Sequence, residues 1–139
     1  MERIDCDVFM KDGTSFDINK VIFITGNFYA GSNCYISSAI IADENIILSE
    51  GVDTVGVCAG GDVYVGKFSK TLGIHADGSI FLDDHSTAND IFAQNDVILG
   101  HDACALSITA NDIIVDTYFC SKPFFIKLFE EIKFFFFGK

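Results

Sequence analysis

A pattern that recurs every 17 residues constrains the fold of this chain more than any other feature. Each copy ends in three residues of which the first and third are apolar, as in Val63-Tyr64-Val65. The copies are Ala42–Leu48, Ala59–Val65, Ala76–Leu82, Ala93–Leu99 and, one residue early, Thr109–Val115. Two-helix repeats need about 33 residues or more, so a unit of this length excludes them. It suits one turn of a β-solenoid, in which strands of successive turns pair at roughly 4.8 Å.

The repeat therefore predicts an all-β fold, a single-stranded parallel β-helix of about six 17-residue rungs. Equivalent residues then form ladders along the rod. One ladder contains Phe23, Ile40, Val57, Ile74, Ile91 and Ile108, and the alternation of side chains along a strand assigns it to the core. Another contains Asn45, Asp62, Ser79, Asp96 and Asp112, which we expect at a corner, hydrogen-bonded to their own backbone.

Three segments follow one another along the chain. In residues 1–20, alternating apolar residues and a turn predict a strand that forms a cap or an irregular first rung. Residues 21–121 form the solenoid. In residues 122–139, Pro123 and the spacing of the charges predict an amphipathic helix of about 14 residues. The four final phenylalanines also favour extended backbone, so the end of this Phe-rich helix or tail stays open.

An apolar stripe on the outside of the rod is the main surface feature that the repeat predicts. Its members are Ile47, Tyr64, Phe81, Ile98 and Ile114. Monomers seldom expose such a stripe, so one alternative is that the tail helix covers it or plugs the open end of the core. The other alternative is that the stripe, or Phe124, Phe125 and Phe129 in the tail, contacts a protein partner, a second rod or a membrane surface.

Charge and cysteine content limit the partners and the location. The formal net charge of −11 argues against nucleic acid, because phosphate backbones bind clustered Lys and Arg. Five irregularly spaced cysteines do not match a secreted disulfide framework. The N-terminus lacks the regions of a signal peptide, and no run of about 18 apolar residues could span a membrane. We expect a reducing, cytoplasmic location, in solution or associated with a membrane.

Residues with metal-binding or catalytic chemistry are few in each column. Cys58 and His75 lie one rung apart, and Cys104 and Cys120 are separated by 16 residues, but a zinc site takes three or four ligands. Asp83-Asp84-His85 could support acid–base chemistry, although its position predicts a solvated corner.

Two further ladders have limited length or an ordinary explanation. Asp96 above Asp112 could attract a cation, or corner hydrogen bonds could relieve the repulsion. Thr54 above Thr71 is too short a run for an ice-binding face, since Ala88 and Ala105 continue it. Lys and Arg total nine, few for gripping acidic polysaccharides as β-helix enzymes do. We predict no catalytic residue, metal, cofactor or nucleotide, and a protein that is not an enzyme.

Two segments, Val55–Val65 and Leu72–Leu82, resemble the repeat of the bactofilins, in which an apolar-Gly-apolar-x-Ala segment precedes an apolar-x-apolar strand. The resemblance covers about residues 21–119. It implies a right-handed β-helix that polymerises end to end, without nucleotide, into cytoskeletal filaments. In bacteria such filaments scaffold cell-wall enzymes or localise other proteins.

An uncapped solenoid end supports the same expectation, because its unpaired backbone groups are a template for another chain. The ends near Phe23 and Phe119 are the candidate contact surfaces for self-assembly into a filament or a small homo-oligomer. The alternative function is a binding module, a capped acidic rod whose apolar stripe or Phe-rich tail docks a partner protein or a membrane.

Overall fold

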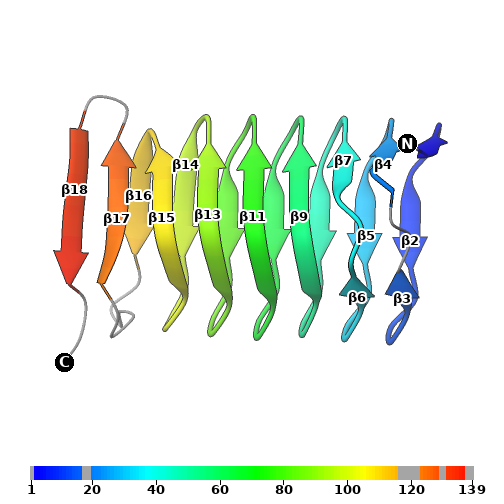
Figure 1. Cartoon of the computed structure of the whole chain (residues 1–139), viewed down its shortest axis with the longest axis horizontal. Helices are drawn as coiled ribbons and strands as arrows, with labels where there is room; N and C mark the ends of the chain where they lie inside the picture. The colour runs from blue at the N-terminus through cyan, green and yellow to red at the C-terminus, as the bar shows by residue number, and fades with distance from the viewer. Residues whose placement is uncertain (1, 17–19, 116–122, 129–130, 137–139) are drawn as a thin grey trace.

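The protein is a straight rod of stacked rungs, with the two ends of the chain at opposite ends of the rod (Figure 1). This computed structural model describes residues 2–16, 20–115, 123–128 and 131–136. Successive rungs lie side by side along the long axis, as a solenoid with one rung per repeat requires (Figure 1). The predicted parallel β-solenoid is confirmed.

Sheet B, the simpler of the two sheets, contains one short strand from each rung. Its seven strands pair in parallel in the order β16-β14-β12-β10-β8-β5-β2. They are β2 (Val8–Met10), β5 (Phe28–Ala30), β8 (Ile46–Leu48), β10 (Val63–Val65), β12 (Ile80–Leu82), β14 (Asp96–Leu99) and β16 (Asp112–Val115). The rod therefore has about seven turns where the sequence predicted about six, because residues 2–16 form a rung of their own.

Sheet A has eleven strands and contains the longer strand of each rung. In the central rungs this strand is seven residues long: β9 (Asp53–Ala59), β11 (Lys70–Ala76), β13 (Thr87–Ala93) and β15 (Cys104–Ala110). The first rungs have shorter pieces, β1 (Glu2–Ile4), β3 (Ser15–Phe16), β4 (Ile22–Ile24), β6 (Tyr35–Ile36) and β7 (Ile40–Ala42). All of these pair in parallel with the next rung.

The core is a dry interior filled by aligned aliphatic side chains. Val57, Ile74, Ile91 and Ile108 stand in register on successive strands and are at most 4 % exposed, as predicted. The assignment of Phe23 to this ladder was wrong. Ile22 pairs with Ile40 and is buried, whereas Phe23 pairs with Ile41 and faces outward. The interval from Ile22 to Ile40 is 18 residues, so counting back by 17 selects the wrong neighbour.

A bend in each long strand of sheet A interrupts the alternation of side chains. In β9, Thr54 and Val57 are buried while Val55 and Gly56 between them both face outward. The register pairs Thr54 with Thr71, and both are buried, so this column lines the interior and not the surface. The bend therefore divides the outer side of sheet A into two strips.

One corner of the rod is held by side chains that bond to the next rung. The Oδ1 atom of Asn27 accepts the backbone N–H of Asn45 at 2.9 Å, and Asn45 Oδ1 accepts that of Asp62 at 2.8 Å. Asp62 Oδ1 accepts the N–H of Ser79 at 2.8 Å. The predicted bonds to their own backbone were wrong for these residues, because the amide of the next rung lies within reach at the strand spacing.

The other corner uses left-handed backbone. Six residues in equivalent positions have positive φ: Gly13, Asn33, Gly51, Phe68, His85 and Asp102. Asn, Asp and Gly adopt this conformation readily, whereas a bulky residue such as Phe68, at φ 58°, does so rarely. Phe68 is 57 % exposed and stacks on the ring of His85 at 5.1 Å, so the tight corner holds both aromatic rings at the surface.

At the C-terminal end, two strands replace the helix predicted for residues 122–139. β17 (Pro123–Leu128) pairs in parallel with β15, and β18 (Glu131–Phe136) pairs antiparallel with β17. The helix prediction was wrong in these ranges because β15 offers a free sheet edge and the segment is rich in β-forming Phe and Ile. Pro123 is the first strand residue, a position that a sheet tolerates.

Candidate functional site

The apolar stripe predicted from the sequence exists on the outer face of sheet B. Ile47, Tyr64, Phe81, Ile98 and Ile114 are paired in register from β8 to β16. The first two rungs extend it, because Phe9 pairs with Tyr29 and Tyr29 with Ile47. From here on, the apolar stripe means all seven residues. Over six rung steps it is about 29 Å long.

The rings of the stripe stack along the rod. Phe9 and Tyr29 stack at 4.6 Å between ring centroids, and Tyr64 and Phe81 stack at 5.3 Å. The five middle members are half-buried by one another, whereas Phe9 is 72 % and Ile114 is 54 % exposed at the two ends. The stripe is thus a continuous apolar ridge of ordered side chains open to solvent.

Sequence counting missed Phe9 and Tyr29 because the early rungs are longer. Phe9 precedes Tyr29 by 20 residues and Tyr29 precedes Ile47 by 18, so a fixed step of 17 does not reach them. The signal that could have found them is the apolar-x-apolar triplet itself, which recurs as Val8-Phe9-Met10 and Phe28-Tyr29-Ala30.

Acidic side chains lie along both sides of the apolar stripe. On one side, the positions two residues before each stripe residue include Asp7, Asp62, Asp96 and Asp112. On the other side, the positions two and three residues after it include Asp12, Glu50, Asp83 and Asp84, with Lys11 and Lys67 as the bases. Four acids on one side, and four acids against two bases on the other, give −6 of the formal chain charge of −11.

One of these acids is tied directly to the stripe. The hydroxyl of Tyr64 donates a hydrogen bond of 2.5 Å to Asp83 Oδ2. This bond to the carboxylate, together with burial and the charges of Asp83 and Asp84, raises the pKa of Tyr64 to about 12. Tyr64 therefore remains a neutral donor at physiological pH and fixes the Asp83 carboxylate beside the ridge.

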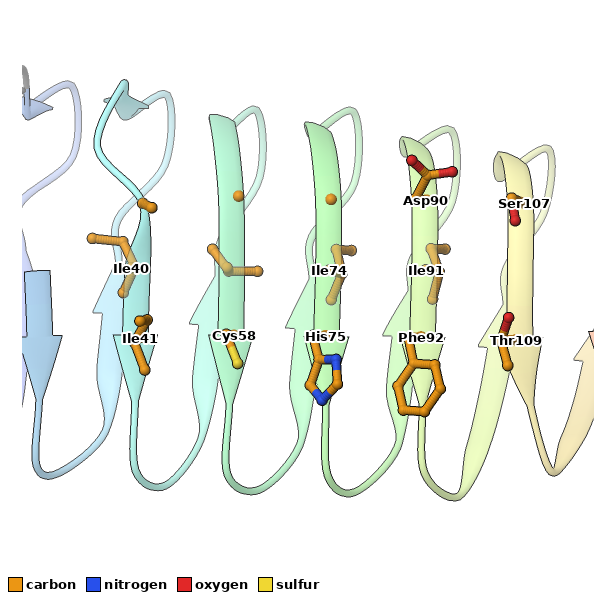
Figure 2. Close-up of a pocket in the computed structure, with 14 residues that line it drawn as sticks. Ile40, Ile41, Cys58, Ile74, His75, Asp90, Ile91, Phe92, Ser107 and Thr109 are labelled. Carbon is orange, nitrogen blue, oxygen red and sulfur yellow. The ribbon is translucent and has the colours of Figure 1, made fainter. Parts of the chain in front are cut away.

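A second surface feature is a shallow groove of about 590 Å³ along sheet A (Figure 2). Its lining includes the outward ladder Ile41, Cys58, His75, Phe92 and Thr109 and the neighbouring small residues Gly56, Gly73 and Ser107. Figure 2 shows these side chains in a row across successive strands. The groove exists because the glycines at the bend leave no side chain beside that ladder.

Cys58 and His75 are neighbours in register, as the sequence predicted, and both lie in this groove. His75 stacks on Phe92 at 4.7 Å, and its Nε2 is 3.5 Å from Asp77 Oδ1. Burial, with a smaller contribution from the Asp77 carboxylate, raises the pKa of the Cys58 thiol. A raised pKa keeps the thiol protonated at neutral pH, which makes it a weak nucleophile.

Metal ligation is limited by the number of side chains that converge. In the part of the chain that the structure describes, no group of three or more His, Cys, Asp or Glu side chains is placed to hold a metal ion. Asp96 and Asp112 are neighbours in register, as expected from the repeat. Cys104 is disulfide-bonded, and Cys120, its suggested neighbour in the sequence, lies outside the described residues.

The run Asp83-Asp84-His85 forms the corner that the sequence predicted for it. Asp84 Oδ1 accepts the backbone N–H of His101 at 2.8 Å, and Asp83 Oδ1 accepts that of Asp84 at 2.7 Å. The Nδ1 atom of His85 lies 3.3 Å from Asp102 Oδ2. The carboxylates of this run therefore hold adjacent backbone in place.

The two ends of the rod do not lie where the sequence placed them. Phe23 is one rung inside the N-terminal end, on the outer face, with the Arg3 guanidinium 5.5 Å from its ring centroid. Phe119 and Phe129 lie outside the described residues. Phe124 and Phe125 belong to β17, one strand from the end of sheet A.

Comparisons with protein-family models, curated proteins and solved structures found no significant match to this chain. Among the described residues, no helix is long and apolar enough to cross a membrane. The features available for assigning a function are therefore the solenoid itself, its two ends, the apolar stripe and the groove.

Proposed function

We propose that this chain is a non-enzymatic structural protein that assembles end to end, without nucleotide, into filaments or scaffolds like those of the bactofilins. The observation that carries the proposal is the open edge of sheet B at each end. In the described part of the chain, β2 pairs only with β5 and β16 only with β14. The bactofilin resemblance adds the right-handed winding and self-association as the family's mode of action.

Backbone groups at the N-terminal edge point away from the rod. Val8 donates its N–H to the Asn27 carbonyl at 2.9 Å, and the Met10 carbonyl accepts the N–H of Gly31 at 2.9 Å. Neighbouring residues of a parallel strand direct these groups to opposite sides, so the N–H and C=O of Phe9 face away from β5. Another chain that pairs there would continue the ladder of sheet B.

The core also supports stacking of rods. An inward ladder of aliphatic residues continues along the rod, and the last rung contributes the partly buried Ile113 and Val115. At the first rung, Met10 is 9 % exposed while Ile4 and Val8 are only partly buried. Stacking a second rod on such an end would bury this apolar area, which stabilises association by about 25 cal/mol per Å².

The test uses a substitution that affects only the free edge. Phe9→Pro removes the outward N–H without removing any bond between β2 and β5, and Phe9→Ala is the control that loses the ring but keeps the N–H. We expect the wild type to form filaments in electron micrographs without nucleotide, Phe9→Ala to retain them, and Phe9→Pro to give short particles.

Two results would contradict the proposal. Uniform small particles of the wild type at all concentrations would exclude filament assembly. Filaments of Phe9→Pro as long as those of the wild type would show that pairing at the edge of β2 does not drive assembly. Circular dichroism of both variants checks that the solenoid is intact.

A further inference from the structure

We infer that the apolar stripe of sheet B is a docking surface for a basic amphipathic helix of a partner protein, with apolar residues on the ridge and Lys or Arg beside the acidic flanks. The inference stands on the outer face of the rod and does not depend on end-to-end assembly. It concerns a surface that runs the full length of sheet B from Phe9 to Ile114.

The shape of this face suits side chains from a partner and not an added strand. The backbone groups of β5 to β14 are paired with the rungs on either side, so a partner lying on the stripe finds no free ladder. A shallow groove of about 330 Å³ lies beside the ridge and is lined by Asp62, Tyr64, Phe81 and Ile98 among others. A partner therefore has to fit a ridge and a groove with projecting side chains.

The dimensions match one helix. The acidic flanks lie two residues on either side of the stripe, or about 13 Å apart at 3.3 Å per residue. A helix with its side chains is about 10–12 Å wide, so it fits between the flanks. The stripe of about 29 Å corresponds to a helix of about 19 residues at 1.5 Å per residue. A helix presents an apolar row and both of its borders on one side, whereas a strand alternates faces.

Charge decides which partner fits. The flanking positions have a net formal charge of −6, which repels the same face of a second copy of this chain and repels anionic lipid. A partner with Lys and Arg on both borders of its apolar row is attracted, since complementary charges steer association and fix its register. The rod's acidity thus selects a basic helix over a second rod or a membrane.

Fluorescence anisotropy tests this with a labelled synthetic peptide of about 19 residues, Leu at helical i, i+3 and i+4 spacing and Lys on both borders. A peptide of the same composition in scrambled order is the control. We expect Phe81→Lys to weaken binding of the ordered peptide at least about tenfold. Leu72→Lys on sheet A, where Leu72 is 55 % exposed, is the matched control variant and should bind unchanged.

The acidic flanks are tested separately, so that the result does not depend on one ring. Asp96→Asn with Asp112→Asn removes two charges while leaving the stripe in place, and should weaken binding and reduce its dependence on salt. These variants also decide the matter if Phe81→Lys does not fold. Thermal melts of each variant report the fold.

Three outcomes would overturn the inference. Equal binding of the scrambled peptide would mean unspecific charge attraction. Binding of the ordered peptide that Phe81→Lys and the double Asn variant leave unchanged would place the contact elsewhere. Failure to bind the peptide, with sedimentation onto vesicles of phosphatidylcholine and phosphatidylserine, would identify the stripe as a membrane-binding surface.

Discussion

The side chain of Asn45 accepts the backbone N–H of Asp62, one rung further along the rod, at 2.8 Å. The same relationship links Asp62 to Ser79, so each side chain at this corner completes the backbone of its successor. Such bonds satisfy amides at the corner, between the paired strands, where the sheet ladders do not reach. They explain why short polar residues recur at this position of the repeat.

Replacing Asn45 by alanine should remove one of these links. The N–H of Asp62 then has water as its partner, and we expect the free energy of unfolding to fall by about 1 kcal/mol. Chemical denaturation measures the change. Asn89→Ala, at an exposed position of sheet A, is the control and should change stability by less than about 0.5 kcal/mol. Equal effects of both substitutions would contradict a role for the corner bond.

Gly78 and Gly73 should respond in opposite ways to alanine. A Cβ at Gly78 would overlap the Asp62 Oδ1 atom and lie 2.9 Å from the Gly61 carbonyl oxygen, whereas a Cβ at Gly73 meets nothing within 4 Å. We expect Gly78→Ala to lower the free energy of unfolding by about 1–3 kcal/mol. Gly73→Ala should be neutral or raise it by up to about 1 kcal/mol, because alanine loses less backbone entropy. Thermal unfolding of the two variants, side by side, gives the comparison.

The interior ladder makes a prediction about packing. Ile74 is 3 % exposed and stands between Val57 and Ile91, so Ile74→Ala should cost about 2–5 kcal/mol. Leu72, two residues away in the same strand, faces solvent, and Leu72→Ala should cost less than about 1 kcal/mol. Urea denaturation separates the two. A small effect of Ile74→Ala would contradict the shared core on which the solenoid depends.

Tyr64 should give the fold a dependence on alkaline pH. Its pKa is raised from an ordinary value of 10.0 to about 12 by the bond to Asp83, burial and neighbouring acids. Because folding favours the protonated phenol, this contribution to stability is fully present below pH 10 and is lost as the pH rises from about 10 towards about 12. Tyr64→Phe should lose this pH dependence and some stability at neutral pH.

Ultraviolet titration of the folded protein measures the same group directly. The chain has four tyrosines, and the difference between the wild type and Tyr64→Phe isolates the ionisation of Tyr64. We expect this difference to appear near pH 12. A difference centred at pH 10 would show that the hydrogen bond to Asp83 does not hold the proton in solution.

The repeat was sufficient to predict the solenoid, the interior ladder from Ile40 to Ile108 and the five central and C-terminal members of the apolar stripe. Each of these depends on a local rule, the alternation of side chains along a strand, repeated at a constant interval. Where the interval changes, the rule assigns the wrong residue. Phe23 was therefore placed in the core, and Phe9 and Tyr29 were left out of the stripe.

The tertiary structure decided what a periodic pattern does not contain. The corner residue Asn45 bonds to the next rung and not to its own backbone, because the next amide is close only after the rungs stack. Residues 123–128 and 131–136 form strands since a neighbouring sheet edge is available to pair with them. The sequence by itself determined which side of each strand is apolar. Stacking determined which backbone and side-chain groups meet, because those contacts join residues a full rung apart.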